Sequence, residues 1–457
     1  MTAYPHSSAA SAPVQPSARA PRLDLDAAPG LAAHLATHGP RPKPAPRRGA
    51  APGALVDELE RAGLRGRGGG WFPTHIKLRG VVASSAGRRR LSRTSRPLAI
   101  ANGMEGEPAS HKDAVLLAAQ PHLVIDGLVL AAEAVGATEA FVAVHRGSPV
   151  QDVLLRALAE RDAAGIDPIT VTLVAPPARY VASEESALAH WIGDGIATPV
   201  YPDRPFQRGV AGRPTLVQNV ETLAHIALIA RHGAQWFASV GAPSAPGTTL
   251  VSVGGSVAAR RVVEVPTGTT VGEILDRCGG TVGGIRGYLT GGYGGALVAA
   301  EGFRDVPWQP DTVAAAGGVI GASILWAMGE EDCPLDDLAR ITAWMAGESA
   351  GQCGPCLFGL PSVADDLRAL AQGSAGERRI AGLTARLQSI AGRGGCKLPD
   401  GAVRLVTTGL DAFADEVALH EQGTCSAAHA RGGPRRSSLP VPPVRNAVDD
   451  TAKEDLR

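Results

Sequence analysis

The sequence lacks a net charge, because 44 lysines and arginines balance 44 aspartates and glutamates among 457 residues. Such a balance gives nucleic acid or an anionic membrane no attraction to the molecule as a whole. Long hydrophobic runs are also missing. The longest apolar stretch, residues 122–135, is interrupted by Asp126 and Glu133, and it is shorter than the roughly 20 residues that span a bilayer. We therefore expect no nucleic-acid partner and no segment inserted into a membrane.

Cysteine is scarce, and a secretion signal is missing. Six cysteines in so long a chain are too few for the disulfide framework of a small secreted protein. The first 22 residues lack the compact charged region and continuous apolar core of a secretory signal. They hold too little apolar surface to offset the entropy of ordering, and the stretch from His429 onward has the same character. We expect a cytoplasmic protein with a disordered tail at each end.

The rest of the chain changes character twice, which predicts three folded parts. Short β-type runs alternate with helical segments over residues 98–176, and this alternation predicts a parallel α/β sheet. Short β-branched runs punctuated by glycine over residues 248–300 predict a small β-rich domain. Further on, apolar residues such as Leu335, Leu338 and Met345 recur at helical spacing and predict a helical bundle.

A glycine-rich stretch, GLRGRGGGWFPTHIKL, occupies residues 63–78. Packed glycines let backbone N–H groups approach an anion or a flat ring closely, and Arg67 and Lys77 add charged donors. The stretch follows a predicted helix rather than a strand, so it is not the glycine fingerprint of a Rossmann dinucleotide site. Two interpretations stay open, a phosphate cradle and a tight structural turn.

Two acidic stretches follow the glycine-rich one. NGMEGEPASHKD places Glu105 and Glu107 in a loop after a predicted strand, where α/β proteins meet the hydroxyl or ring N–H groups of a ligand. YVASEESAL places Glu184 and Glu185 at a predicted helix start. The structural alternatives are a solvated acidic turn for the first pair and ordinary helix capping for the second.

The stretch ESAGQCGPC pairs Cys353 with Cys356, and Cys396 follows in GRGGCKLPDGA. On its own, a Cys-x-x-Cys pair with one distant cysteine is a modest metal signal. A zinc site and three unligated, buried thiols are the alternatives to an iron–sulfur centre.

Taken in order, these stretches resemble one family, the NADH-binding flavoprotein subunit of respiratory complex I and its relatives in bidirectional hydrogenases and NAD-dependent formate dehydrogenases. The segments that match the family's motifs are Gly66–Lys77, Asn102–Asp113, Tyr180–Leu188, Pro205–Phe206 with Gly212–Thr222, and Glu348–Cys356. The resemblance covers roughly residues 50–425, and five motifs in the same order argue against coincidence.

The resemblance implies an α/β Rossmann-like FMN domain, a β-grasp domain and a C-terminal four-helix bundle. We expect a largely disordered tail and lead-in at residues 1–50 and the FMN and dinucleotide-binding domain at 51–245. The β-grasp domain is expected at 246–325, the helical iron–sulfur-binding domain at 326–425, and a disordered tail at 426–457.

The resemblance also implies an oxidoreductase in which a hydride passes from NADH to FMN. Single electrons then pass through a [4Fe–4S] cluster to a partner, such as a ferredoxin or another redox subunit, and the protein supplies placement and tuning. The residues that the resemblance places around the flavin are Gly66, Arg67, Gly68, Gly69, Lys77, Asn102, Glu105, Tyr180, Glu184, Asn219 and Thr222. It places Glu107 and Glu185 toward the dinucleotide, and Cys353, Cys356 and Cys396 at the cluster.

The chain departs from the family pattern at these same places. Trp71 stands where a glycine lets the nicotinamide approach, so its ring is expected to obstruct access. Met104 replaces an aspartate near the flavin, Gln218 replaces one of two paired asparagines, and Asp203 replaces a lysine whose charge Arg204 is placed to supply. Trp71 and Met104, together with Ala350, are consistent with a rival interpretation, a non-catalytic electron-relay or scaffold subunit that has lost the use of NADH.

Ala350 stands where the family has the first cysteine of its cluster motif, and an alanine methyl group cannot bind iron. Three thiolates still suffice for a [4Fe–4S] cluster with one open or non-cysteine site, or for a [3Fe–4S] cluster. The candidates for a substitute ligand are Glu348, Ser349, Cys333 and Cys425. A flavoprotein without a cluster is the further alternative.

Overall fold

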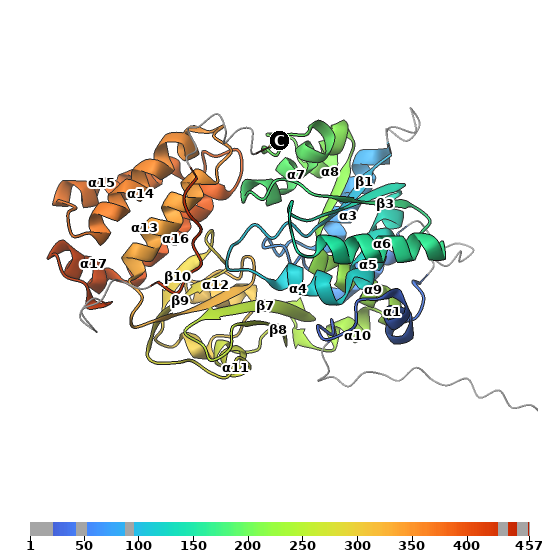
Figure 1. Ribbon diagram of the computed structural model, residues 1–457, viewed down its shortest axis with the longest axis horizontal. Coiled ribbons are helices and arrows are strands. Elements are labelled where there is room, and N and C mark those ends of the chain that lie inside the picture. The colour runs from blue at the N-terminus through green and yellow to red at the C-terminus, as the bar shows by residue number, and fades with distance from the viewer. Residues whose placement is uncertain (1–21, 43–52, 87–95, 428–436, 446–455, 457) are drawn as a thin grey trace, which may run out of the picture.

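The computed structural model describes residues 22–42, 53–86, 96–427, 437–445 and 456. Within them the chain forms three neighbouring parts in sequence order: an α/β part, a mixed sheet, and a group of helices (Figure 1). Residues 1–21, most of the expected N-terminal tail, lie outside the described residues.

The first part is built on a four-stranded parallel sheet in the order β3-β2-β1-β4. Its strands are β1 (Leu98–Asn102), β2 (Glu139–Ala143), β3 (Thr170–Val174) and β4 (Thr215–Asn219). All but the last residue of β1 are buried, as expected for a central strand of a sheet covered on both faces. β1 and β4 pair in register with Asn102 opposite Asn219, so two polar residues end neighbouring strands at the same edge.

Helices surround this sheet and confirm the predicted parallel α/β part. They are α1 (Leu31–His38), α2 (Ala54–Ala62), α3 (Thr74–Ala86), α4 (Lys112–Ala119), α5 (Pro121–Val135), α6 (Gln151–Ala164), α7 (Glu185–Asp194), α8 (Pro205–Arg208), α9 (Val220–His232) and α10 (Ala234–Ala238), with short turns η2 (Val181–Ser183) and η3 (Val210–Gly212). Helices α5 and α9 pack very closely: a Cβ on Gly127 would lie 1.9 Å from the Leu223 carbonyl oxygen. Only glycine permits this approach.

No single helix among the described residues has both the length and the apolar composition needed to cross a membrane. Helices α4 and α5 meet these criteria only as a pair, and the pair is bent by 98°. Helix α5 lies in the main hydrophobic core of the first part, where Leu123 and Leu128 are at most 1% exposed.

The second part is a mixed sheet in the order β10-β9-β11-β7-β8. Its strands are β7 (Thr248–Gly255), β8 (Arg261–Pro266), β9 (Ile285–Thr290), β10 (Ala296–Ala299) and β11 (Ile324–Gly329), preceded by the short ribbon β5 (Gly241–Ala242) and β6 (Ala245–Pro246). Only the β7 and β11 pair is parallel among these five strands. Helices α11 (Val271–Asp276) and α12 (Pro310–Ala315) and the turn η4 (Phe303–Asp305) share its hydrophobic cluster, which includes the fully buried Trp308.

The third part is helical. Its elements are α13 (Pro334–Gly347), the π-helical turn η5 (Pro355–Gly359), α14 (Leu360–Ala371), α15 (Glu377–Ile390), α16 (Leu398–Ala412) and α17 (Ala414–Glu421). The apolar face predicted for α13 is fully buried at Leu335, Leu338, Ile341 and Met345. The cysteine motif follows the end of α13, as the sequence predicts.

Both terminal segments contain packed residues. Leu23 is fully buried, and its N–H donates to Glu264 at 3.0 Å. In the segment expected to be a C-terminal tail, Leu439 is only 3% exposed, and the Ser438 N–H donates to Asp332 at 2.9 Å. Residues 437–445 therefore pack on the fold, because Leu439 gains burial and Ser438 supplies hydrogen bonds that a tail would leave to water.

Candidate functional site

A cavity of about 870 Å³ lies at the carboxyl end of the parallel sheet, between the first part and the helical part. This volume is in the range of small-molecule and cofactor sites. All residues that the sequence assigns to the flavin and the dinucleotide line this one cavity: Gly66, Arg67, Gly68, Gly69, Lys77, Asn102, Glu105, Glu107, Tyr180, Glu184, Glu185, Asn219 and Thr222. Cys396 belongs to the same wall.

The glycine loop connects α2 to α3 and approaches the rest of the wall without side chains. A Cβ on Gly68 would lie 3.0 Å from the Cβ of Asn219, and Gly69 has a φ of 107°, which favours glycine. The loop is anchored by the Arg67 N–H, which donates to the Thr222 hydroxyl at 2.8 Å. The loop is therefore a tight structural turn, and it also leaves space for a ligand, as a phosphate cradle would.

Arg67 differs from the expectation that its side chain donates to a phosphate. Its guanidinium is buried and donates to the backbone carbonyls of Arg65, Pro246 and Thr248 at 3.1–3.3 Å. Burial lowers its pKa to about 10. Because its donors serve these carbonyls, the side chain ties the loop to the start of β7.

Trp71 belongs to the wall of the cavity rather than to its open space. Its side chain is 7% exposed and packs in the hydrophobic cluster of the second sheet, with the Arg67 guanidinium 4.3 Å from the ring centroid. Met104 is fully buried in a hydrophobic cluster with Leu98 and Ile100 of β1. Arg204 lines the cavity, as expected of a substitute for the missing lysine, whereas Asp203 pairs with Arg208 at 3.5 Å.

One end of the cavity holds polar groups without partners among the described residues. The Thr74 hydroxyl, at the start of α3, and the Gln218 side-chain amide nitrogen are both buried and make no hydrogen bond there. Both residues line the cavity. One turn further along α3, the Lys77 ammonium lies 2.6 Å from a Glu185 carboxylate oxygen. A helix start with a nearby lysine is a favourable place for an anion, and the orphaned groups are donors that a cofactor would satisfy.

A buried ion network supports the floor of the cavity. The Lys112 ammonium lies 2.7 Å from Asp113 and 2.9 Å from Glu221, and Asn219 donates to Asp113 at 2.7 Å. Burial alone would lower the pKa of Lys112, but these two carboxylates raise it. Burial would raise the pKa of Glu221, yet Lys112, His225 and Arg67 hold it at about 2. Sequence reasoning missed Glu221, which stood within a matched motif but had no assigned role.

Two of the predicted acids are helix caps. Glu105 accepts the backbone N–H groups of Asp113 and Ala114 at the start of α4, both at 3.0 Å. Glu184 accepts those of Ser186 and Ala187 at the start of α7, at 2.9 and 3.0 Å. Burial raises the pKa of both carboxyls. The capping alternative therefore applies to Glu184 and also to Glu105, while both still line the cavity.

Glu107 is a partly buried acid of the cavity that is held by residues of the second part and by Tyr180. It accepts the Tyr180 hydroxyl at 3.1 Å and the Tyr293 N–H at 2.9 Å. A Cβ on Gly292 would lie 2.5 Å from its carboxyl carbon, so the chain closes tightly around it. Burial, only partly offset by these hydrogen bonds, raises the pKa of Glu107 to about 7. This carboxyl is therefore poised to gain or lose a proton in that range.

The three cysteines of the motif lie close together beside the cavity. The Gly395 N–H donates to the Cys353 sulfur at 3.3 Å. Burial, with the neighbouring thiols of Cys396 and Cys353, raises the pKa of Cys356 to about 12. Metal binding would release these protons, since thiolates are the ligands. Neighbouring cysteine thiolates of this kind are the ligands that hold iron–sulfur clusters.

The surroundings of Ala350 narrow the choice of a fourth ligand. Cys333 precedes α13 and the motif follows it, so the 14 residues of this helix separate them by about 21 Å. Cys425 lies within 4.8 Å of Cys333 and is equally remote. The Glu348 carboxylate already accepts hydrogen bonds from the Arg179 guanidinium at 3.1 Å and from the Tyr180 N–H at 2.8 Å. The Ser349 hydroxyl is buried without a hydrogen-bond partner among the described residues.

Two family models match the chain. Residues 59–228 match the Nuo51 FMN-binding domain, and residues 336–420 match the iron–sulfur binding region of NADH-ubiquinone oxidoreductase F. The first range contains the glycine loop and the parallel sheet, and the second contains the three cysteines.

Several curated relatives are similar over most of their length. The NADH-quinone oxidoreductase F subunit of Streptomyces coelicolor is 33% identical over 387 residues, which cover 82% of this chain and 84% of that protein. The protein of the same name from Mycobacterium tuberculosis is 33% identical over 417 residues, covering 87% of this chain and 89% of the relative. That of Escherichia coli is 30% identical over 340 residues, covering 71% and 74%.

Among solved structures, a chain of an NAD⁺-reducing [NiFe]-hydrogenase in the H₂-reduced state has a similar fold. The TM-score is 0.72 and the sequence identity 28%, over 81% of this chain. The match spans 63% of the length of that hydrogenase chain.

We expect Glu107→Gln to change the pH dependence of stability. Because folding raises the Glu107 pKa from 4.5 to about 7, the free energy of unfolding falls as pH rises through this window. The glutamine does not titrate, and its amide can still accept from Tyr293 and donate to Tyr180. The free energy of unfolding of Glu107→Gln, compared with that of the parent protein, should therefore rise by roughly 1–3 kcal/mol between about pH 5 and pH 8.

Urea denaturation of the ligand-free protein at the two pH values measures this difference. The matched control is Glu301→Gln, since Glu301 is exposed. This substitution should change the free energy of unfolding by the same amount at both pH values. If Glu107→Gln and the parent protein differ in free energy of unfolding by the same amount at both pH values, this carboxyl does not titrate in the window.

Proposed function

Because the chain belongs to the family of NADH-quinone oxidoreductase F subunits, we propose that it is an NADH:acceptor oxidoreductase subunit. It takes electrons from NADH and relays them through FMN and an iron–sulfur cluster to a partner protein. One observation carries this proposal: a single cavity joins the glycine loop, the ends of two parallel strands and Cys396 of the cysteine set. FMN bound there would supply the chemistry of hydride acceptance and one-electron release.

The phosphate end of the flavin is proposed to lie at the start of α3. The Thr74 hydroxyl and the Gln218 amide nitrogen need acceptors, which phosphate or flavin oxygens supply. Lys77 adds a positive charge and exchanges its contact with Glu185, at 2.6 Å in the ligand-free chain, for one with the phosphate. Glu185 is then released toward the dinucleotide, where its carboxylate is placed to accept from hydroxyl groups.

The ring end is proposed to lie toward Glu107 and Tyr180, near Cys396. The backbone of Gly68 and Gly69 leaves room for a flat ring. Glu107 holds a proton for part of the time near neutral pH, because its pKa is about 7, so its carboxyl is able to donate to or accept from the bound nucleotide. Asn102, Asn219 and Thr222 fix the loops that border this space.

The cluster is proposed to bind Cys353, Cys356 and Cys396 as a [4Fe–4S] cluster with one open or non-cysteine site, or as a [3Fe–4S] cluster. Of the substitute ligands considered, Ser349 is the one supported, because its buried hydroxyl has no other partner among the described residues. Because Cys396 lines the cavity, a cluster held there would lie beside a flavin bound in it.

The finer division of the fold follows from the same assignment. We assign the flavin and dinucleotide site to residues 51–245 and a β-grasp domain to 246–325, supported by the mixed five-stranded sheet with α11 packed on it. The sheet's strand β11 carries this domain on to Gly329. A four-helix bundle is assigned to 326–425, supported by the mutual packing of α13, α14, α15 and α16. The partner is proposed to be a ferredoxin or another redox subunit, in the cytoplasm.

A non-catalytic relay or scaffold subunit is the second candidate. Ala350 favours it, because the cysteine set has one thiolate fewer than the family's motif.

The first test is the cofactor content and activity of protein purified without oxygen. We expect FMN and iron with sulfide, and NADH-dependent reduction of an artificial acceptor such as ferricyanide. Flavin and cluster without NADH-dependent reduction would support the relay subunit instead. Protein that takes up neither FMN nor iron would overturn both interpretations of the cavity.

Lys77→Ala should weaken FMN retention by roughly 10-fold to 100-fold, because a charged hydrogen bond contributes about 1.5–3 kcal/mol. Equilibrium dialysis with FMN measures the loss. The control is Arg79→Ala, which removes a positive charge from the same helix, where Arg79 pairs with Asp57 and Glu60 at the surface. Equal FMN affinity in both variants would place the phosphate elsewhere.

Ala350→Cys should slow the loss of the cluster in air, because it restores a fourth thiolate. Iron content and visible absorbance against time of exposure measure the loss. Ser349→Ala should accelerate it. The control Ala346→Cys adds a buried thiol one turn before residue 350 and should change nothing. If Ala350→Cys behaves like this control, the fourth position of the cluster is not beside residue 350.

A further inference from the structure

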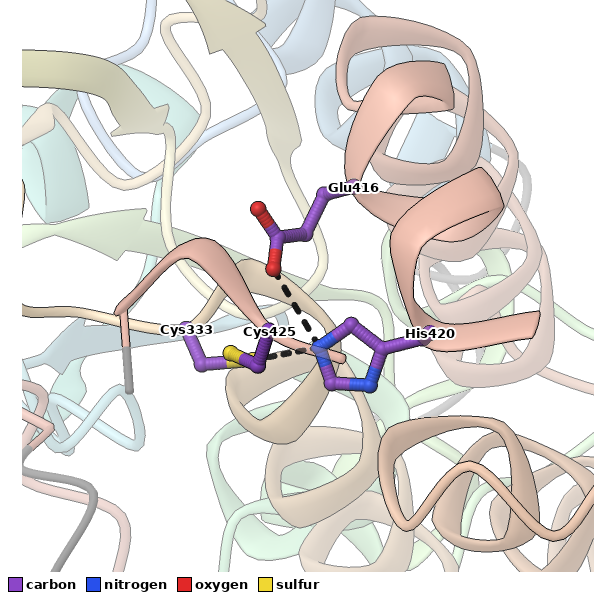
Figure 2. Close-up of side chains that lie close together, drawn as sticks. All are labelled: Cys333, Glu416, His420 and Cys425. Carbon is purple, nitrogen blue, oxygen red and sulfur yellow. Dashed lines mark hydrogen bonds and ion pairs between the residues drawn. The ribbon is translucent and has the colours of Figure 1, made fainter. Parts of the chain in front are cut away.

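A second group of metal-ligand side chains lies in the helical part, away from the cavity. Cys333 precedes α13, Glu416 and His420 belong to α17, and Cys425 follows α17. One ligand atom from each lies within 4.8 Å of all the others, and all four residues are buried. Figure 2 shows the four side chains pointing toward one another.

Local structure explains how the four residues meet. Glu416 and His420 are four residues apart, so they lie on one face of α17. The helix ends at Glu421, and Gly423, with a φ of 74°, lets the chain turn back in a conformation that suits glycine. This turn brings Cys425 beside the helix it has just left. Cys333 comes from the link between β11 and α13, 87 residues before His420.

The spacing of the ligand atoms matches a tetrahedral site. The Cys333 sulfur lies 3.5 Å from His420 Nε2, and a Glu416 oxygen lies 3.2 Å from the same nitrogen. Zinc bonds of about 2.3 Å to sulfur and about 2.0–2.1 Å to nitrogen or oxygen, at tetrahedral angles, place these pairs about 3.6 and about 3.3 Å apart. The side chains are therefore already spaced for the ion.

The surroundings also suit a divalent cation. Two thiolates and the Glu416 carboxylate carry three negative charges, which Zn²⁺ and Arg286, 3.5 Å from Glu416, balance. The Ser426 N–H donates to Glu416 at 3.0 Å, and the Ser426 hydroxyl donates to the other carboxylate oxygen. Such outer hydrogen bonds orient a ligand toward its metal.

We infer that Cys333, Glu416, His420 and Cys425 bind a structural zinc ion. All four tetrahedral positions come from the protein, so no position is open to water or substrate, which is the mark of a structural site rather than a catalytic one. The ion ties α17 and the turn after it to the start of α13. This inference does not depend on the proposed flavin chemistry.

The test is metal analysis of the full-length chain, expressed without a polyhistidine tag in medium containing zinc and purified without chelators. We expect one zinc ion per chain in addition to the iron of the cluster. Zinc-edge X-ray absorption should show two sulfur ligands near 2.3 Å and two lighter ligands near 2.0 Å.

Two matched double variants assign the ion to its site. Cys333→Ser with Cys425→Ser should lower the zinc content at least tenfold while FMN content is unchanged. Cys353→Ser with Cys356→Ser should lose iron and keep zinc. Glu416→Gln, a milder change, should retain the fold and release zinc to a chelator faster than the parent protein.

Three results would overturn the inference. The first is parent protein without zinc and with all six cysteines reactive after denaturation. The second is parent protein with a Cys333–Cys425 disulfide in place of the metal. The third is zinc that follows Cys353 and Cys356 rather than Cys333 and Cys425. The X-ray absorption measurement on the parent protein decides the question even if a variant fails to fold.

Discussion

The buried ion pairs of Lys112 are the interaction on which the walls of the cavity depend. The Lys112 ammonium contacts the carboxylates of Asp113 and Glu221, and through Glu221, which accepts the Leu250 N–H at 2.9 Å, it links the starts of α4 and α9 to β7 of the second sheet. Removing one member of such a network leaves an uncompensated buried charge, at a cost of about 3–5 kcal/mol. The contact between these two parts of the fold therefore depends on a buried charge, that of Lys112, which also lines the cavity.

Much of the site could be predicted from sequence because its parts are local. The glycine loop, the strand ends at Asn102 and Asn219, and the acids at helix starts follow from spacing and flanking elements, and they do surround one cavity. The roles of individual side chains are harder to predict. Arg67 is expected from sequence to meet a phosphate, yet its guanidinium serves the carbonyls of residues 65, 246 and 248, two of them far away in sequence. Glu221 escapes prediction for the same reason: its partners lie on other elements.

The cysteines show the same limit more sharply. Composition and spacing single out Cys353, Cys356 and Cys396, and these do lie together. Cys333 and Cys425 are candidates for the missing ligand of that set only while the sequence is considered alone, because the sequence does not show which residues distant along the chain pack beside the motif. Helix α13, with its 14 residues, separates the two groups of thiols, because one group lies at each end of the helix. A motif with a missing ligand and a group of four ligands without a family motif thus occupy the same helical part.

The segment at residues 437–445 runs along α13 from one of these ends toward the other (Figure 1). Ser438 bonds Asp332 and accepts the indole N–H of Trp326 at 3.1 Å, and Arg445 lies 3.8 Å from Glu348. A chain cut after the last helix would lose these contacts, open the flank of Trp326 to solvent and leave the Asp332 carboxylate to water. The natural limit of this protein as a folding unit therefore falls beyond Arg445, and shortened versions meant for crystallisation or partner mapping should retain it.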